Sequence, residues 1–215
     1  PVEQRICPPA IDPCSPKNMD LPPPVMKKYL KKFGIPTDKP IIAQISRFDK
    51  WKNPEKVIDI FRKVKKKVDC RLVLCGSMAS DDPEGLEIFS KVQESASHLT
   101  QNHDVILITN ENNILVNAIQ RAASVIIQRS SKEGFGLTVT EALWKEKPVI
   151  ASNIGGIPLQ IEDGVSGYLV DPDDTDGFVK RTIDLLEHPD LGLQMGRNGK
   201  EVVREKFLIT RLLLD

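Results

Sequence analysis

A short cationic loop is the first part of this sequence whose residues could do chemistry. Arg47, Lys50 and Lys52 lie within residues 46–53, and Pro54 follows at a position typical of the first turn of a helix. Guanidinium and ammonium groups beside the free N–H groups of a helix N-terminus suit phosphate oxygens. The loop therefore predicts a phosphate site, and the alternative is a solvated turn whose cations form surface ion pairs.

The second such segment reads EGFGLTVTE and begins at Glu133. A helix is expected to begin near Leu137, which leaves Glu133 in the loop and places Glu141 in about the first helical turn, both facing one crevice. Carboxylates repel phosphate but accept hydrogen bonds from sugar hydroxyls, whereas the exposed amides of Gly136, Leu137 and Thr138 suit phosphate. The alternative is a glycine turn followed by a glutamate that the helix dipole favours.

Other segments are less specific. Gly76-Ser77 and Gly155-Gly156 each fit either an ordinary turn or the backbone wall of a ligand crevice. The three histidines are isolated, and no Walker loop, GxSxG motif or GxGxxG motif after a strand is present. We therefore expect no metal site and no resident cofactor.

Six short, continuous apolar runs must position these loops. Such runs are typical of parallel strands that are buried on both faces. Helical patterns lie between them, so we predict a doubly wound α/β fold with a mostly parallel six-stranded sheet and helices on both faces. Ligands of such sheets bind beyond the carboxyl ends of the strands, where both loops lie. The predicted strands are 41–45, 71–75, 105–109, 125–128, 149–151 and 168–170. One predicted helix is capped by Asn53 and carries an apolar stripe at Val57, Phe61, Val64 and Val68. The other predicted helices are 25–33, 86–96, 114–123, 137–145, 175–187 and 190–207.

The prolines suggest how the chain is organised. Ten of the 16 fall within the first 40 residues, so 1–39 is predicted to be a lead-in segment with one short helix. Residues 40–207 form the predicted domain, and 208–215 a truncated tail. The absence of an initiator methionine suggests a fragment or a processed product.

Composition excludes several function classes. The hydrophobic content is 40%, which is typical of a globular protein, and Lys+Arg 30 balances Asp+Glu 30, so no general affinity for nucleic acid or anionic lipid is expected. No apolar run approaches the ~18 residues that a membrane span requires. The four cysteines are too few for a disulfide framework, although Cys7 and Cys14 could pair across a proline-rich loop. We predict a cytoplasmic protein.

Read in order, these segments resemble the C-terminal half of a family-four retaining glycosyltransferase with the GT-B fold. Two glutamates eight positions apart at a helix start, beside an Arg-x4-Lys loop, are more specific than either feature alone. The segments that carry the resemblance are 8–12, 46–53, 133–152, Gly155-Gly156 and 164–172. Within the family, 78–85, 116–122 and 131–150 are most similar to members that form trehalose.

The resemblance implies a role for each residue of the cationic loop and the helix start. Arg47 and Lys52 would hold the diphosphate of a nucleotide-glucose donor, either UDP-glucose or ADP-glucose, and stabilise the charge of the leaving group. The amides of Gly136, Leu137 and Thr138 would add to that site.

The two glutamates would bind the sugars of the donor. Glu141 would accept hydrogen bonds from the ribose hydroxyls, while Glu133 would hold hydroxyls of the glucose and stabilise positive charge on its ring. The family transfers glucose with retention and without a metal, through a short-lived oxocarbenium-like ion pair. The acceptor implied here is glucose, which gives trehalose.

Two departures from the family accompany this resemblance. The family usually has glycine where this sequence has Glu146. A non-glycine residue in a left-handed turn at this position is expected to cost about 1 kcal/mol of backbone strain, unless the turn has another conformation. The N-terminal domain, which in this family binds the acceptor, is expected to be absent from these 215 residues. The isolated chain should therefore bind the nucleotide but not catalyse the transfer of glucose. A homodimer is one possible oligomeric state.

Three alternatives remain. A trehalose phosphorylase would use phosphate in place of the nucleotide and shares parts of the same segments. A non-catalytic nucleotide-binding or assembly module could use the same scaffold, although no acidic cluster for magnesium stands out. One half of a nucleotide-sugar epimerase shares the architecture, but the close pairing of the two glutamates disfavours it.

Overall fold

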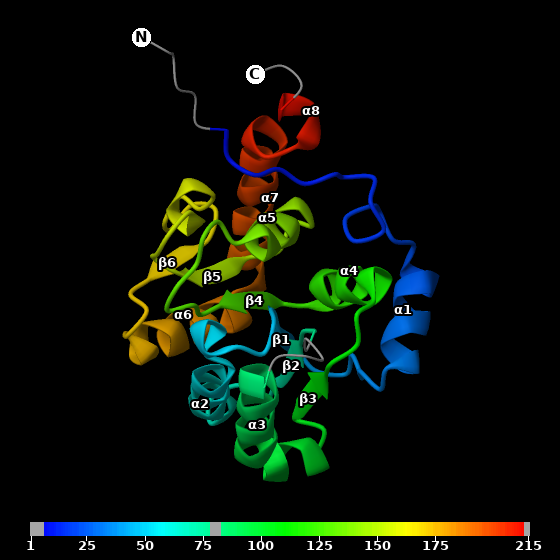
Figure 1. The fold of residues 1–215 in the computed structure, drawn as a ribbon, viewed down its shortest axis with the longest axis vertical. Helices are drawn as coiled ribbons and strands as arrows, with labels where there is room; N and C mark the ends of the chain where they lie inside the picture. Colours follow the sequence, from blue (N-terminus) through cyan, green and yellow to red (C-terminus); the bar gives the residue numbers. More distant parts are fainter. Residues whose placement is uncertain (1–6, 78–82, 213–215) are drawn as a thin grey trace.

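The computed structural model describes residues 7–77 and 83–212 (Figure 1). Residues 1–6 of the predicted lead-in, 78–82 of the segment similar to trehalose-forming enzymes, and 213–215 of the predicted tail lie outside the described residues.

One six-stranded sheet forms the centre of the molecule, and all of its neighbouring strands are parallel. The strand order is β3-β2-β1-β4-β5-β6, so the direction of winding reverses between β1 and β4. This confirms the predicted doubly wound fold. In such a sheet the crevice at the reversal point is the usual place for a ligand. The strands are β1 Ile41–Ile45, β2 Arg71–Cys75, β3 Val105–Ile108, β4 Val125–Gln128, β5 Val149–Ser152 and β6 Tyr168–Val170.

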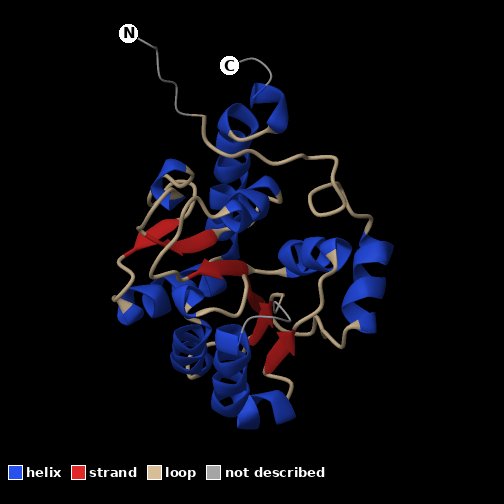
Figure 2. Ribbon diagram, viewed as in Figure 1, coloured by secondary structure: helices blue, strands red, loops and turns tan. Residues whose placement is uncertain are grey.

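Helices cover both faces of the sheet, as Figure 2 shows. Apolar residues of α1, α4 and α5 pack on one face, and those of α2, α3 and α6 pack on the other. The helix α7 contributes Val203 to the first core and Met195 to the second. The helices are α1 Pro23–Lys32, α2 Pro54–Lys65, α3 Pro83–Gln101, α4 Asn113–Ala122, α5 Leu137–Trp144, α6 Thr175–Glu187, α7 Pro189–Lys206 and α8 Ile209–Leu212, with 3-10 turns η1 Lys50–Lys52 and η2 Ile157–Leu159.

The start of α2 differs from the prediction. Asn53 occupies the N-cap position, but its side chain makes no capping hydrogen bond, because the residue has a left-handed backbone (φ 47°). Asp49 instead caps the preceding turn η1, where its carboxylate accepts hydrogen bonds from the N–H groups of Trp51 and Lys52. The cationic loop therefore contains a short helical turn of its own.

The helix α3 is longer than predicted at both ends; its first turn is polar, while Leu99 in its last turn continues the apolar stripe of Val92 and Ala96. The predicted apolar stripe on α2 is buried at Val57, Phe61 and Val64, whereas Val68 lies beyond the last turn and is half-buried.

The N-terminal segment passes the ends of α7 and α8 on its way to α1 (Figure 1). Ile11 donates a hydrogen bond to the carbonyl of Phe207 and accepts one from the N–H of Ile209. Leu21, Leu30 and Ile35 are buried in the same core as α4 and α5. These contacts hold residues 7–35 firmly against the rest of the chain.

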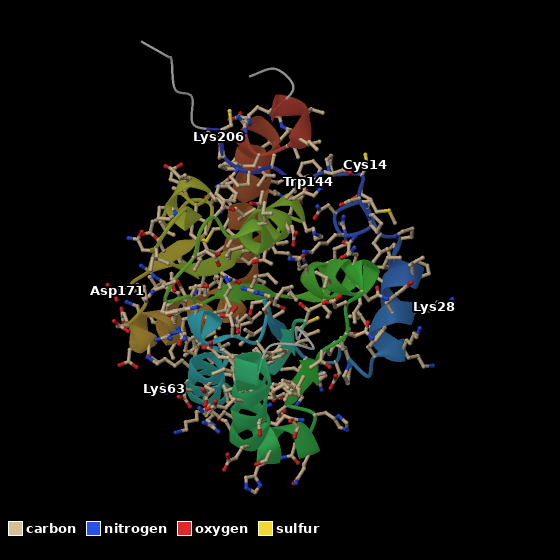
Figure 3. All side chains as sticks on the ribbon, viewed as in Figure 1. Cys14, Lys28, Lys63, Trp144, Asp171 and Lys206 are labelled. Atoms are coloured by element: carbon tan, nitrogen blue, oxygen red, sulfur yellow. The ribbon has the colours of Figure 1, made fainter. Side chains whose placement is uncertain are left out.

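All four cysteines are free thiols. Cys7 and Cys14 are exposed and unbridged, and Figure 3 shows Cys14 at the outer surface. Burial raises the pKa of Cys70 to about 11 and that of Cys75 to about 12, so both thiols stay protonated near neutral pH.

Candidate functional site

A cavity of about 410 Å³ lies at the carboxyl ends of the strands, beside the point where the winding reverses. It is walled by the loops that follow β1, β2 and β3 and by the first turn of α5. Arg47 and Thr138 of the predicted site line it, and so does Lys17 of the N-terminal segment. Other lining residues are Ser46, Gly76, Ser77, Asn110 and Asn112.

A larger cavity of about 670 Å³ lies elsewhere, beside α1 and His103. Its residues Pro36 and Thr37 precede β1, and His103 precedes β3, so it opens at the amino ends of the strands. The predicted phosphate and sugar residues do not line it. The smaller cavity is therefore the candidate functional site.

The cationic loop is held rigidly at its end. The buried Gln44 of β1 donates a hydrogen bond to the carbonyl of Lys52 at 2.8 Å. Arg47 is exposed, and its guanidinium lies 3.3 Å from the carboxylate of Asp49, which also caps the turn. Arg47 is therefore an exposed residue of the cavity lining, while Lys52 is largely buried and does not line the cavity.

Lys52 and Glu133 form the centre of the two predicted segments. The Nζ of Lys52 lies 2.5 Å from Glu133 Oε2, and both side chains are largely buried. Gln128 and Ser130, at the end of β4, also lie within hydrogen-bond distance of that oxygen, at 3.3 and 3.4 Å. The structure thus brings the cationic loop and the first glutamate into direct contact.

The two loops are also joined through Trp51. Its carbonyl accepts a hydrogen bond from the N–H of Ser131 at 2.8 Å, and Lys132 lies 4.0 Å from the centre of its ring. Lys50 lies over the same ring. Two cations on one indole favour an ordered contact between the loops.

Gly155-Gly156 supports the glutamate loop from behind. A Cβ on Gly155 would lie 1.9 Å from the carbonyl oxygen of Glu133, and the N–H of Gly156 donates to the carbonyl of Gly134 at 2.7 Å. Gly155 also has a left-handed backbone (φ 58°). Only glycine fits at position 155, and the Gly155-Gly156 pair therefore packs directly against the backbone of the glutamate loop. Gly76 approaches the carbonyl of Ser46 in a similar way.

The start of α5 lies beside this contact. Gly136 is the N-cap residue with φ 85°, and a Cβ there would lie 3.4 Å from Glu133 Cγ. Leu137 is exposed, and Thr138 lines the cavity. The first amides of α5 therefore lie beside Glu133 and the cavity.

Glu141 lies in the second turn of α5 rather than the first. It is buried, and its Oε1 is 2.9 Å from the Nζ of Lys17, while its Oε2 has no hydrogen-bond partner. Thr138 is three residues earlier on the same helix face. Glu141 is thus separated from the cavity by Lys17, which lines it.

A second lysine lies behind Glu141. Lys145 donates hydrogen bonds to the carbonyl of Glu141 and to Asn18 Oδ1, both at 3.0 Å. Burial lowers the pKa of Lys145 to about 7, against the opposing effect of the Glu141 charge. This lysine therefore joins α5 to the N-terminal segment with a charge that depends on pH near neutrality.

The predicted residues fall into two groups. Lys52 and Glu133 are in direct contact and Gly136 lies next to Glu133, whereas Arg47 and Thr138 line the cavity, which those three residues do not line. Glu141 reaches the cavity through a lysine that the sequence analysis did not select. The residues missed are Lys17, Asp49 and Gln128; of these only Asp49 had a local signal, as an N-cap residue type before a short turn.

Two absences apply to residues 7–77 and 83–212. No group of three or more His, Cys, Asp or Glu side chains in these ranges could hold a metal ion. No helix within them is long and apolar enough to span a membrane.

The fold is that of the C-terminal domains of GT-B glycosyltransferases. Residues 25–202 match the family "Glycosyl transferases group 1". The chain belongs to this family, which confirms the resemblance found from the motifs.

The curated relatives point to a narrower group. The chain is similar to the trehalose synthase of Thermococcus litoralis, with 47% identity over 97% of this chain and 50% of that protein. It is also similar, more distantly, to the trehalose phosphorylase of Grifola frondosa, with 36% identity over 77% of this chain and 24% of that protein. The chain spans about half the length of the trehalose synthases that it matches.

Solved structures agree on the fold. The C-terminal domain of LpcC from Francisella tularensis, a group 1 glycosyl transferase, aligns with a TM-score of 0.73 at 25% identity, over 86% of this chain and 93% of that one. HepE from Anabaena in complex with UDP-glucose aligns with a TM-score of 0.77 at 18% identity, over 89% of this chain and 51% of that one. The second likeness concerns the fold alone.

Proposed function

We propose that this chain is the donor-binding part of a retaining glucosyltransferase that moves glucose from a nucleoside diphosphate glucose to a sugar acceptor. The acceptor we propose is glucose, and the product trehalose. The main support is the contact between Lys52 and Glu133, which joins a phosphate-type loop to a sugar-type loop beside a cavity at the carboxyl ends of the strands. The identity of 47% to trehalose synthases supports the choice of product.

The diphosphate would lie between the cationic loop and the start of α5. Arg47 in the cavity lining and the largely buried Lys52 beside the cavity would hold its oxygens. Both cations would offset the negative charge that develops on the diphosphate as its bond to glucose breaks. The amides of Gly136, Leu137 and Thr138 would donate hydrogen bonds to the same oxygens.

The two sugars of the donor would bind on either side of the diphosphate. Glu133, held by Lys52, would accept hydrogen bonds from glucose hydroxyls and lie near the positive charge that forms on the sugar ring. Glu141 would accept hydrogen bonds from the ribose hydroxyls. Glucose would leave the diphosphate and join the acceptor on the same face, which preserves the configuration of its anomeric carbon.

A second part of the protein is needed for this reaction. Since the chain spans about half the length of the trehalose synthases that it matches, we propose that an N-terminal domain of the same enzyme supplies the acceptor site. The 215-residue chain alone is then expected to bind the donor with negligible turnover.

A phosphorylase is the second candidate, supported by 36% identity to the Grifola frondosa enzyme. In that reaction inorganic phosphate takes the place of the nucleotide, so the ribose role of Glu141 would have no purpose. The higher identity to the trehalose synthases, 47% against 36%, favours the nucleotide donor.

Calorimetric titration of the chain with UDP, ADP and GDP, and then with their glucose conjugates, tests the proposal. We expect one nucleoside diphosphate to bind, and its glucose conjugate to bind at least as tightly. Glucose 1-phosphate is the matched ligand for the phosphorylase, and binding of that compound without any nucleotide would overturn the proposal. Turnover measured on the 215-residue chain alone would contradict the proposed need for a second domain.

A further inference from the structure

Lys17 lies between the candidate cavity and Glu141. Its Nζ is 2.9 Å from Glu141 Oε1, and its side chain is 31% exposed, whereas that of Glu141 is 6% exposed. Lys17 lines the cavity and Glu141 does not. A ligand that enters the cavity therefore meets the ammonium group before it meets the carboxylate.

The carboxylate behind Lys17 is only half satisfied. Glu141 Oε2 is buried and has no hydrogen-bond partner, and the ion pair occupies only the other oxygen. A buried carboxylate oxygen without a donor is costly, so groups with several O–H donors would bind here better than one ammonium. Adjacent ribose hydroxyls are such groups.

Lys17 also lies near the cationic end of the cavity. Its positive charge reaches Cys75 at the end of β2, where it lowers the pKa of a thiol that burial raises. Ser46 and Arg47, at the end of the neighbouring strand β1, line the same cavity. The charged groups around it are Glu141, Lys145 and, in the cavity lining, Arg47 and Glu111; of the two carboxylates, Glu141 is the one that Lys17 contacts.

We propose that Lys17 is a donor-binding residue that changes partner when the donor binds. The ribose hydroxyls replace its ammonium at Glu141, and the ammonium then binds the diphosphate within the cavity that Arg47 lines. This inference rests on the proposed function, because it takes the ligand to be a nucleoside diphosphate.

The exchange has a consequence for ligand choice. A nucleoside without phosphates would have to move the ammonium into a cavity lined by both Arg47 and Glu111, whose charges offset each other, and would itself offer no anion. A nucleoside diphosphate brings two phosphate groups for it. Lys17 should therefore oppose the binding of nucleosides and favour the binding of nucleoside diphosphates.

Calorimetry on the 215-residue chain and on Lys17→Met tests this, with uridine and UDP and, in parallel, adenosine and ADP. We expect Lys17→Met to weaken the diphosphate that binds by about tenfold and to tighten its nucleoside by about threefold. Lys17→Arg should keep most of the diphosphate affinity. Lys63→Met is the matched control, because Lys63 is an exposed lysine on α2 (Figure 3) that is paired with Asp176 at 2.7 Å and lies outside the cavity.

Each other outcome overturns the inference. Equal weakening of both ligands would mean that Lys17 only maintains the structure, and tightening of both would mean that it only blocks the site. Unchanged affinities would remove Lys17 from the site. Failure of the unaltered chain to bind either diphosphate would instead refute the proposed function itself.

Discussion

Glu133 precedes α5 and Glu141 lies in its second turn, and the carboxylate of each is paired with one lysine, yet their surroundings differ. Glu133 Oε2 lies within hydrogen-bond distance of Lys52, Gln128 and Ser130, all on loops or strands next to it. Glu141 has one partner, from the distant N-terminal segment, and a buried oxygen with none. The comparison indicates that Glu133 is fixed in place before any ligand arrives, whereas Glu141 is left with capacity for new hydrogen bonds.

The largest expected effect is on stability and comes from Gly155, which packs against the backbone of Glu133 and not against Glu141. Gly155→Ala would push a methyl group against the Glu133 carbonyl in a left-handed turn, so the free energy of unfolding should fall by about 3 kcal/mol or more. Urea unfolding measures this.

Gly164→Ala is the matched control for that change. Gly164 has φ 75°, but a Cβ there meets nothing within 4 Å, so only the backbone strain remains, about 1 kcal/mol. Equal losses in the two variants would show that the close approach behind Glu133 contributes nothing.

The cations of the loop should have similar effects on binding but different effects on stability. Lys52→Ala and Arg47→Ala should each weaken UDP or ADP binding by roughly 1.5–3 kcal/mol, as expected for charge-assisted contacts. Only Lys52→Ala should also lower the free energy of unfolding, because it leaves Glu133 buried without its counterion. Calorimetry that shows unchanged affinity in both variants would reduce the loop to a surface turn.

The free energy of unfolding should depend on pH through Lys145, the buried lysine that contacts the backbone of Glu141. The unfolded chain keeps this lysine protonated up to its ordinary pKa of 10.5, while the folded chain releases the proton near its pKa of about 7. The unfolded state therefore binds more protons in between, and the free energy of unfolding should rise with pH, by on the order of 2 kcal/mol between about pH 6.5 and about pH 8.5.

Lys145→Met should remove most of that rise; burial also lowers the pKa of Lys147, which adds a rise of the same sign, and a slope of full size in the variant would assign the effect to Lys147 or another group. The pH range stops below the ordinary pKa of cysteine, 9.0, because the raised pKa values of Cys70 and Cys75 make stability fall with pH above it.

The smallest effects should come from removing one charge at each glutamate. Glu141→Gln should weaken UDP and UDP-glucose alike, by about tenfold, because ribose is common to both ligands. Glu133→Gln should weaken UDP-glucose and spare UDP. If both variants gave the same pattern across the two ligands, the assignment of ribose to one glutamate and glucose to the other would be wrong.

Much of the fold was predictable because its strands are continuous apolar runs in a sheet that is covered on both faces. β1, β2, β4 and β6 have the predicted bounds, and Leu137 begins α5 as expected. The first turn of α3 was missed because it is polar and carries no periodic signal, and the last turn was missed because Leu99 is the one apolar residue in it.

The site was predictable where its parts are local in sequence. Lys52 and Glu133 each lie in a motif that follows a strand, and the parallel topology brings those motifs together. Lys17 has no such motif, and its place at Glu141 depends on the path of the N-terminal segment. Tertiary packing over a long sequence separation decided that contact.

The turn after α5 bears on which positions of this chain can vary. Glu146 adopts the left-handed backbone (φ 57°) expected where the family usually has glycine, and its side chain is tied to Lys200 at 2.7 Å. The helix α7 approaches so closely that a Cβ on Gly196 would lie 2.0 Å from the Glu146 carbonyl. In a library of variants, position 146 should accept glycine or asparagine, while position 196 should accept only glycine. The strict requirement for glycine therefore lies at Gly196 on α7 and not in the turn itself.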